Sequence, residues 1–102
     1  MREAGGAALT VVVRLAAALR PHAGGAPCIE LDLPPPVTVR AVIDAVAAAH
    51  PAVGRRVRDE AGTLRRHVNV FVGTDNSRDL QDVDTVVPEG TEVAVLPAIS
   101  GG

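Results

Sequence analysis

The sequence predicts a small α+β domain in which one main helix packs on a mixed sheet. Its 102 residues are enough for a single hydrophobic core and too few for two. Several short segments alternate between apolar and polar residues, which is typical of half-buried strands, and one segment near the middle has helical spacing. Because a single helix covers one face of a sheet, we expect two layers.

Two alternating segments near the N-terminus predict a pair of antiparallel strands. Residues 9–14 place leucine and valines on one face, and residues 28–33 repeat the alternation with isoleucine and leucines. Between them, residues 15–20 are expected to make a short helical turn that stops before Pro21. The Gly- and Pro-rich residues 22–27 then predict a turn.

The one long helix is predicted to begin after Thr38 and to end before Pro51. The prolines at 34–36 end the preceding strand, because proline donates no hydrogen bond to a sheet. The Thr38 hydroxyl is placed to accept a hydrogen bond from the first helical turn. Residues 52–59 could add another turn of helix. The apolar residues at the spacing i, i+3, i+4 and i+7 are Val39, Val42, Ile43 and Val46.

Two further strands are predicted in the C-terminal half. Residues 67–72 alternate, with three valines on one face and Phe71 on the other. Residues 73–77 indicate a turn, and residues 78–87 an irregular segment that could include a short strand. The last strand is expected at residues 91–96, with its valines on the core face.

Composition excludes several classes of function. All ten basic residues are arginine, so the chain has no lysine for a phosphate-binding loop or a Schiff base. The net charge of −2 gives no basic surface for nucleic acid, and the one cysteine indicates a reducing compartment. Glu3 and Arg14 argue against a signal peptide, and no apolar run approaches the ~18 residues of a membrane span. We expect a cytoplasmic protein that binds neither membrane nor nucleic acid.

The residues that most often bind metals are too scattered to predict a site. They are His22, Cys28, His50 and His67. No two of them have the short spacing of zinc ligands. Cys28 shares its strand face with Glu30 and Asp32, and nearby carboxylates disfavour a reactive thiolate. We therefore expect no bound metal and no bound cofactor.

The C-terminal tail is the strongest candidate for a reactive site. Glycine has no side chain, so Gly101 and Gly102 predict a narrow ribbon that ends in the α-carboxylate. At ~3.3–3.6 Å per residue, the residues after Pro97 could carry that carboxylate roughly 17 Å from the folded domain. A carboxylate is a poor electrophile, so a sulfur nucleophile would need it activated first, as an acyl-phosphate or acyl-adenylate. The residues expected to thread into a partner ahead of Gly102 are Pro97, Ala98, Ile99, Ser100 and Gly101.

Four stretches form a pattern that resembles a known family. They are Thr38–Val39, Arg65–Val72, Pro88–Val93 and Leu96–Gly102. Together they resemble the ubiquitin-like sulfur carrier proteins, small β-grasp proteins related to the molybdopterin synthase small subunit and the thiazole-synthesis carrier. Leu19–Gly25 looks most like the actinobacterial branch that serves cysteine biosynthesis. We expect a β-grasp domain at residues 9–97, between a flexible leader at 1–8 and a flexible tail at 98–102.

The resemblance implies a carrier rather than an enzyme. A partner E1-like adenylyltransferase of the ThiF or MoeB type would use MgATP to adenylate the Gly102 carboxylate. A sulfur donor would then form a thiocarboxylate there, to be consumed by a sulfurtransferase, a cysteine-synthase-type enzyme or a secondary-metabolite thiolation enzyme. Two alternatives are a small subunit of molybdopterin synthase and a non-covalent ubiquitin-like interaction module in which the glycine pair is incidental.

Five residues outside the tail are candidates for partner binding. By strand parity, Phe71 points to the face that the helix does not cover, with Leu96 and Val12 as possible neighbours. The alternative is that Phe71 belongs to the core. Arg65 and Arg66 could meet acidic surface on an activating enzyme, and the alternative is that they lie on a solvated loop.

Overall fold

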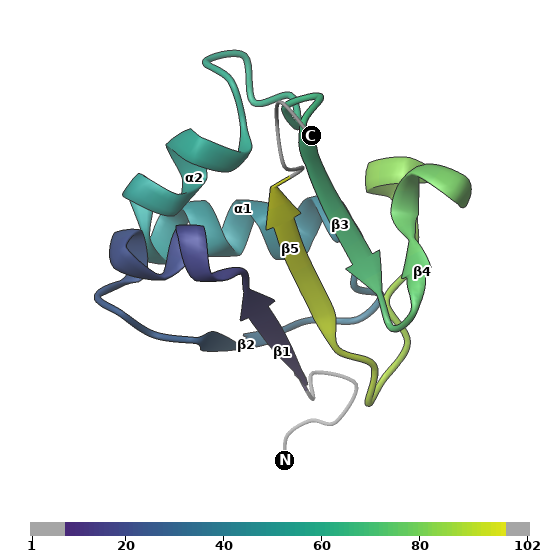
Figure 1. Ribbon diagram of the computed structural model, residues 1–102. Coiled ribbons are helices and arrows are strands. Elements are labelled where there is room, and N and C mark those ends of the chain that lie inside the picture. The colour runs from purple at the N-terminus through teal and green to yellow at the C-terminus, as the bar shows by residue number, and fades with distance from the viewer. Residues whose placement is uncertain (1–7, 98–102) are drawn as a thin grey trace.

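Five strands form one mixed sheet, and the helices gather on one of its faces (Figure 1). The computed structural model describes residues 8–97. The strands are β1 (Leu9–Leu15), β2 (Cys28–Leu33), β3 (Val68–Val72), β4 (Asp75–Asn76) and β5 (Val93–Pro97). The α-helices are α1 (Val39–Ala49) and α2 (Pro51–Val57), and the 3-10 segments are η2 (Ala17–Ala23), η3 (Ser77–Asp79) and η4 (Asp82–Asp84).

The last strand lies in the centre of the sheet. The strand order is β2-β1-β5-β3-β4, so β5 runs between β1 and β3. It is parallel to β1 and antiparallel to β3, whereas β1 and β2 form the antiparallel pair that the sequence predicts. The sheet is therefore mixed, as predicted, and its central parallel pair joins the two ends of the chain.

The core is built almost entirely from valine, leucine and isoleucine. Alternate residues of β1, β3 and β5 point toward the helices and are buried, which confirms the predicted alternation. The four apolar positions predicted for the long helix are all buried in α1, and α2 adds Val53 and Val57. Burying branched side chains of this size contributes about 1.5–3 kcal/mol each. The buried strand residues are Val11, Val13, Leu15, Ile29, Val68, Val70, Val72, Val93 and Val95.

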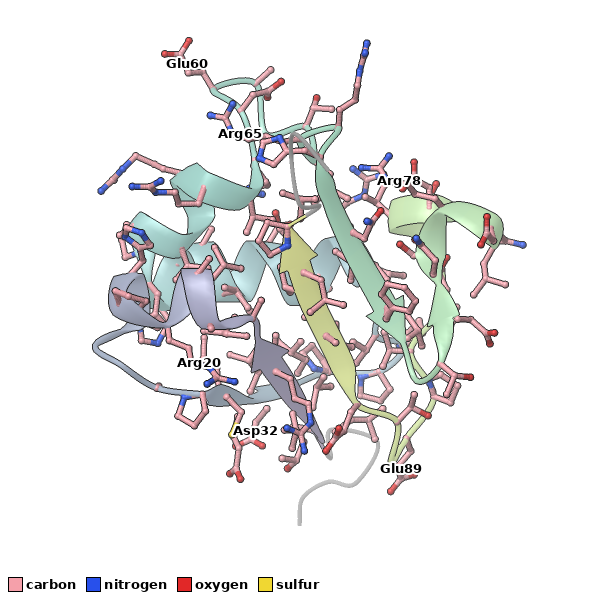
Figure 2. The ribbon with its side chains drawn as sticks, viewed as in Figure 1. Arg20, Asp32, Glu60, Arg65, Arg78 and Glu89 are labelled. Atoms are coloured by element: carbon pink, nitrogen blue, oxygen red, sulfur yellow. The ribbon has the colours of Figure 1, made fainter. Side chains whose placement is uncertain are left out.

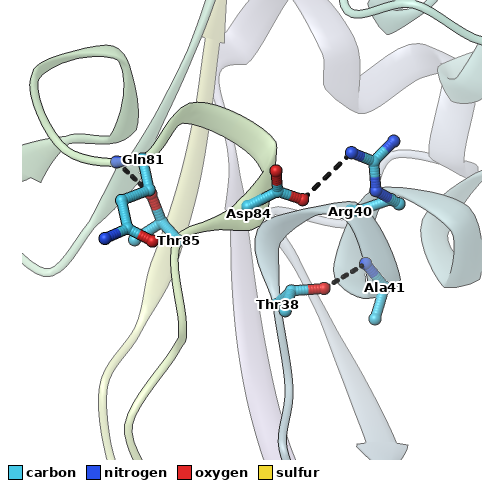
Figure 3. Close-up of polar contacts among 6 residues, drawn as sticks. All are labelled: Thr38, Arg40, Ala41, Gln81, Asp84 and Thr85. Carbon is cyan, nitrogen blue, oxygen red and sulfur yellow. Dashed lines mark hydrogen bonds and ion pairs between the residues drawn. The ribbon is translucent and has the colours of Figure 1, made fainter.

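The start of α1 is tied to the segment between β4 and β5. The Thr38 hydroxyl caps the helix by accepting from the Ala41 amide at 3.2 Å, as predicted (Figure 3). The Val39 amide donates to the Thr85 carbonyl at 2.9 Å, and Arg40 forms a 3.0 Å ion pair with Asp84. The segment predicted as irregular is thus held against the helix by backbone and side-chain contacts.

Two local predictions need correction. The helical turn expected to stop before Pro21 instead spans Ala17–Ala23 with Pro21 inside it. Proline has a fixed φ that a 3-10 helix accepts, so Pro21 costs the segment only the one hydrogen bond that its missing N–H would donate. The turn predicted at residues 73–77 includes β4, which pairs with β3 through Phe71 and Asn76.

The second helix crosses the first at very short range. Gly54 of α2 is buried against Ala47 of α1. A Cβ atom on Gly54 would lie 2.6 Å from the Ala47 Cβ and 2.9 Å from its Cα, closer than carbon atoms pack. The absence of a side chain at Gly54 therefore permits this contact between helices.

Candidate functional site

The base of the tail lies at one end of the central strand. Pro97 is the last described residue, and in the register of β5 with β3 it lies opposite Val68. Val68 is fully buried, so the last pair of the ladder rests on the core. The five remaining candidates of the tail fall outside the described residues, and their roles stay predictions: Ala98, Ile99, Ser100, Gly101 and Gly102.

The sheet face opposite the helices, here called the open face, carries the predicted partner-binding residues. Phe71 lies on this face and is half-buried, so it is outside the core. Its register partners are Ala94 on one side and Asn76 on the other. Leu96, which is 38% exposed, lies opposite Asn69. Phe71, Ala94 and Leu96 give the β5–β3 half of the open face an apolar character.

The other half of the open face is polar. Val12 is half-buried there, on β1, and shares the face with Phe71 without being its register partner. Arg14 donates from Nε to a Glu92 carboxylate oxygen at 2.8 Å. That hydrogen bond raises the pKa of Arg14. Cys28 is exposed and lies opposite Arg14.

A turn rich in arginine leads into β3 beside the base of the tail. Arg65 is half-buried and donates from Nε to the Arg55 carbonyl at 3.2 Å, whereas Arg66 is exposed. Arg78, which follows β4, donates from Nη2 to the carbonyls of both residues. Figure 2 shows Arg65 and Arg78 at this end of the molecule. Sequence reasoning missed Arg78, because an arginine in an irregular segment carries no periodic signal.

The part of the chain that the structure describes holds its possible metal ligands apart, and the absence of a bound metal or cofactor stays a prediction. Residues 8–97 contain no cluster of three or more His, Cys, Asp or Glu side chains suited to a metal ion. Among the same residues, none of the helices is long and apolar enough to span a bilayer. An open hollow of about 340 Å³ beside α2 has mixed charge, because Arg55, Arg58 and Arg65 share it with Asp59 and Glu60.

Comparison with known proteins identifies the family. The ThiS family matches residues 13–102, which is most of the chain. The chain belongs to the ThiS family.

Two curated relatives are similar to this ThiS-family protein over most of their own length. It is 31% identical over 96 residues to the sulfur carrier protein CysO of Mycobacterium tuberculosis, covering 92% of this chain and 100% of the relative. It is also 31% identical over 78 residues to small archaeal modifier protein 1 of Haloferax volcanii, covering 76% of this chain and 85% of the relative. The chain is thus similar to ubiquitin-like sulfur carriers over nearly its whole length.

Solved structures confirm the β-grasp fold of this ThiS-family protein. The crystal structure of Mycobacterium tuberculosis CysO matches with a TM-score of 0.75 at 31% identity, over 87% of this chain and 99% of that one. That of small archaeal modifier protein 1 from Haloferax volcanii matches with a TM-score of 0.80 at 30% identity, over 91% and 99%. A chain of the Amycolatopsis orientalis BexX/CysO complex matches at 0.77 and 32% identity, over 90% and 99%.

Proposed function

We propose that this ThiS-family protein carries sulfur on its C-terminal residue. A partner E1-like adenylyltransferase would bind MgATP, and the Gly102 carboxylate would attack the α-phosphorus to form an acyl-adenylate with release of pyrophosphate. A sulfur nucleophile would then displace AMP and leave a thiocarboxylate, which we call sulfur loading. Transfer of that sulfur to an acceptor, with water adding to the acyl carbon as the C–S bond breaks, returns the carboxylate for another cycle, so the carrier is a cosubstrate of its partners.

The observation that carries this proposal is the family match, which continues through Gly102. The relative from Mycobacterium tuberculosis is named a sulfur carrier protein and is covered completely. The fold suits the role, because the tail follows directly from a central strand held by β1 on one side and β3 on the other. The similarity to CysO favours cysteine or another sulfur-containing metabolite as the product.

The open face is the surface on which we expect the activating partner to dock. Phe71 and Leu96 are apolar side chains outside the core, on the strands β3 and β5 that meet at the base of the tail. A partner that covers them would also be placed to receive the tail. The BexX/CysO complex shows that a similar carrier has been crystallised with a second protein. Arg65 and Arg66, in the turn beside Pro97, are proposed to meet acidic side chains at the edge of the same partner.

Intact-mass measurement tests the proposal. The purified chain is incubated with a candidate E1-like adenylyltransferase, MgATP and sulfide, and its mass is followed with time. A carrier gains the mass of sulfur in place of oxygen, and fragmentation places the change at Gly102. A mass that stays constant with every adenylyltransferase from the same genome would favour the non-covalent interaction module. The acceptor is then found by offering the loaded carrier an activated serine derivative or a pterin precursor.

Replacing Phe71 with alanine is expected to weaken docking of the activating partner. An aromatic anchor at the centre of an interface contributes about 2 kcal/mol or more, so KM for the carrier should rise about thirtyfold or more. ATP–pyrophosphate exchange at varied carrier concentration measures KM. The matched control is Leu80→Ala, because Leu80 is 48% exposed but lies in the segment between η3 and η4, off the open face. Equal KM values for Phe71→Ala and wild type would remove Phe71 from the interface.

A further inference from the structure

One guanidinium nitrogen of Arg78 donates to three backbone carbonyl oxygens, two in the turn before β3 and one at the first residue of β3. Nη2 lies 2.9 Å from the Arg65 oxygen, 3.3 Å from the Arg66 oxygen and 2.7 Å from the Val68 oxygen. Figure 2 shows Arg78 at the end of the molecule where β3 starts. Hydrogen bonds from a charged donor are stronger than those between neutral groups, and here they converge on one short segment.

The turn and Arg78 are each held in place by further hydrogen bonds. The Val68 amide donates to the Arg65 carbonyl at 3.0 Å, which closes the turn. On the other side, the Arg78 amide donates to the Asn76 side-chain oxygen at 3.0 Å, and Asn76 Nδ2 donates to the Asn69 side chain at 3.3 Å. Arg78 is thus anchored to the middle of β3 while it reaches back to the beginning of the same strand.

The turn that Arg78 holds lies against the base of the tail. Val68 is the register partner of Pro97, the last described residue of β5. A shift of the turn would therefore displace the point at which the chain leaves the sheet. A misplacement of about 1 Å at the reacting atom costs roughly a hundredfold in rate, so a displacement that is passed along the tail would slow the reaction in the partner's active site.

We propose that Arg78 is a positioning residue for sulfur loading, because it fixes the turn at 65–68 and thereby the point and direction at which the tail leaves β5. The inference rests on the proposed function. It assigns Arg78 a role through its hydrogen bonds to this chain's own backbone.

Two substitutions of Arg78 separate the effect of side-chain geometry from the effect of side-chain charge. Arg78→Lys keeps the positive charge but replaces a planar fork with a compact ammonium on a different stem, and Arg78→Gln removes the charge. We expect both variants to lose at least tenfold in kcat for adenylation, with a smaller rise in KM for the carrier. The rise is smaller because Phe71 and Leu96 on the open face are unchanged, and only Arg65 and Arg66 move with the turn. A carrier that was merely less stable would show the opposite pattern, since unfolded molecules raise the apparent KM and leave kcat intact.

The matched control is Arg56→Gln, which removes the same charge. Arg56 is exposed on α2, and its side chain has no hydrogen bond or ion pair with residues 8–97. Its kcat and KM should stay within twofold of wild type. Amide hydrogen exchange gives a second readout without any partner: exchange at Val68 should accelerate at least tenfold in both Arg78 variants and remain unchanged in Arg56→Gln.

Each outcome decides one proposal. If wild type loads sulfur and Arg78→Gln loads with the same kcat, the positioning role is wrong while the carrier function stands. If Arg78→Lys retains wild-type kcat although exchange at Val68 accelerates, the charge of residue 78 is what matters, and the positioning role is again wrong. Failure of wild type to load with any activating enzyme instead contradicts the carrier function, and unchanged exchange at Val68 would separately show that Arg78 does not hold the turn.

Discussion

A Gly102→Val carrier is expected to fold normally and to lose at least a hundredfold in the rate of adenylation. Valine is branched at Cβ and restricts the backbone next to the carboxylate that must attack ATP. A misplacement of about 1 Å at the reacting atoms costs roughly 10²-fold, and the new side chain must also pass a channel suited to glycine. The measurement is the initial rate of ATP–pyrophosphate exchange with the activating enzyme, together with intact mass after sulfide is added.

Two further variants control the Gly102 experiment. Gly102→Ala adds a single methyl group and should give an intermediate loss, whereas deletion of Gly101 and Gly102 should abolish loading. Thermal unfolding of all three should coincide with wild type, because the substitutions lie beyond the last strand, which ends at Pro97. A Gly102→Val carrier that acquires sulfur at the normal rate would contradict the proposed role of the tail.

Gly54→Ala is expected to destabilise the fold, although alanine is the better helix former. Helix propensity alone predicts a gain of about 1 kcal/mol from this change. In the structure the new Cβ would lie 2.6 Å from the Ala47 Cβ, so α1 and α2 must move apart, and overpacking of this kind costs about 1–3 kcal/mol. We expect the clash to outweigh the propensity, with a net loss of up to about 2 kcal/mol. Tm should then fall by up to roughly 15 °C.

A second substitution at the same contact tests the cause. Ala47→Gly removes the methyl group that the new Cβ would meet, so the double variant Ala47→Gly, Gly54→Ala should be more stable than the two single changes predict by addition. A coupling of about 1 kcal/mol is typical for residues in contact. Urea unfolding of the four proteins measures it. A Gly54→Ala protein more stable than wild type would show that the two helices are not packed this closely.

Much of the secondary structure could be predicted because the apolar pattern is local. The alternation in β1, β2, β3 and β5 follows from each strand having one buried face, and α1 combines helical spacing with a cap at Thr38 and a stop at Pro51. The segment at 73–87 resisted prediction because its shape depends on distant partners. There, the Val87 amide donates to the Val37 carbonyl at 2.7 Å, and the Val39 amide donates to the Thr85 carbonyl.

Residues of the candidate site could be predicted only where the local sequence pattern was enough. Parity was enough to place Phe71 on the open face, whereas the role of the glycine pair lies outside the described residues and stays a prediction. The register partners of Phe71 depended on strand order, which periodicity does not contain. They are Ala94 and Asn76, and Leu96 follows Ala94 by two residues on the same face of β5. The contact of Arg78 with the turn before β3 depends in the same way on tertiary structure.

The central position of β5 has a mechanical consequence. A partner that draws in the tail applies tension to the end of a strand with a neighbour on each side, β1 in parallel and β3 antiparallel. Such a force is resisted in shear, by many backbone hydrogen bonds at once. An edge strand, in contrast, could be peeled from the sheet one hydrogen bond at a time. We therefore expect the domain to stay folded while an enzyme pulls on its C-terminus.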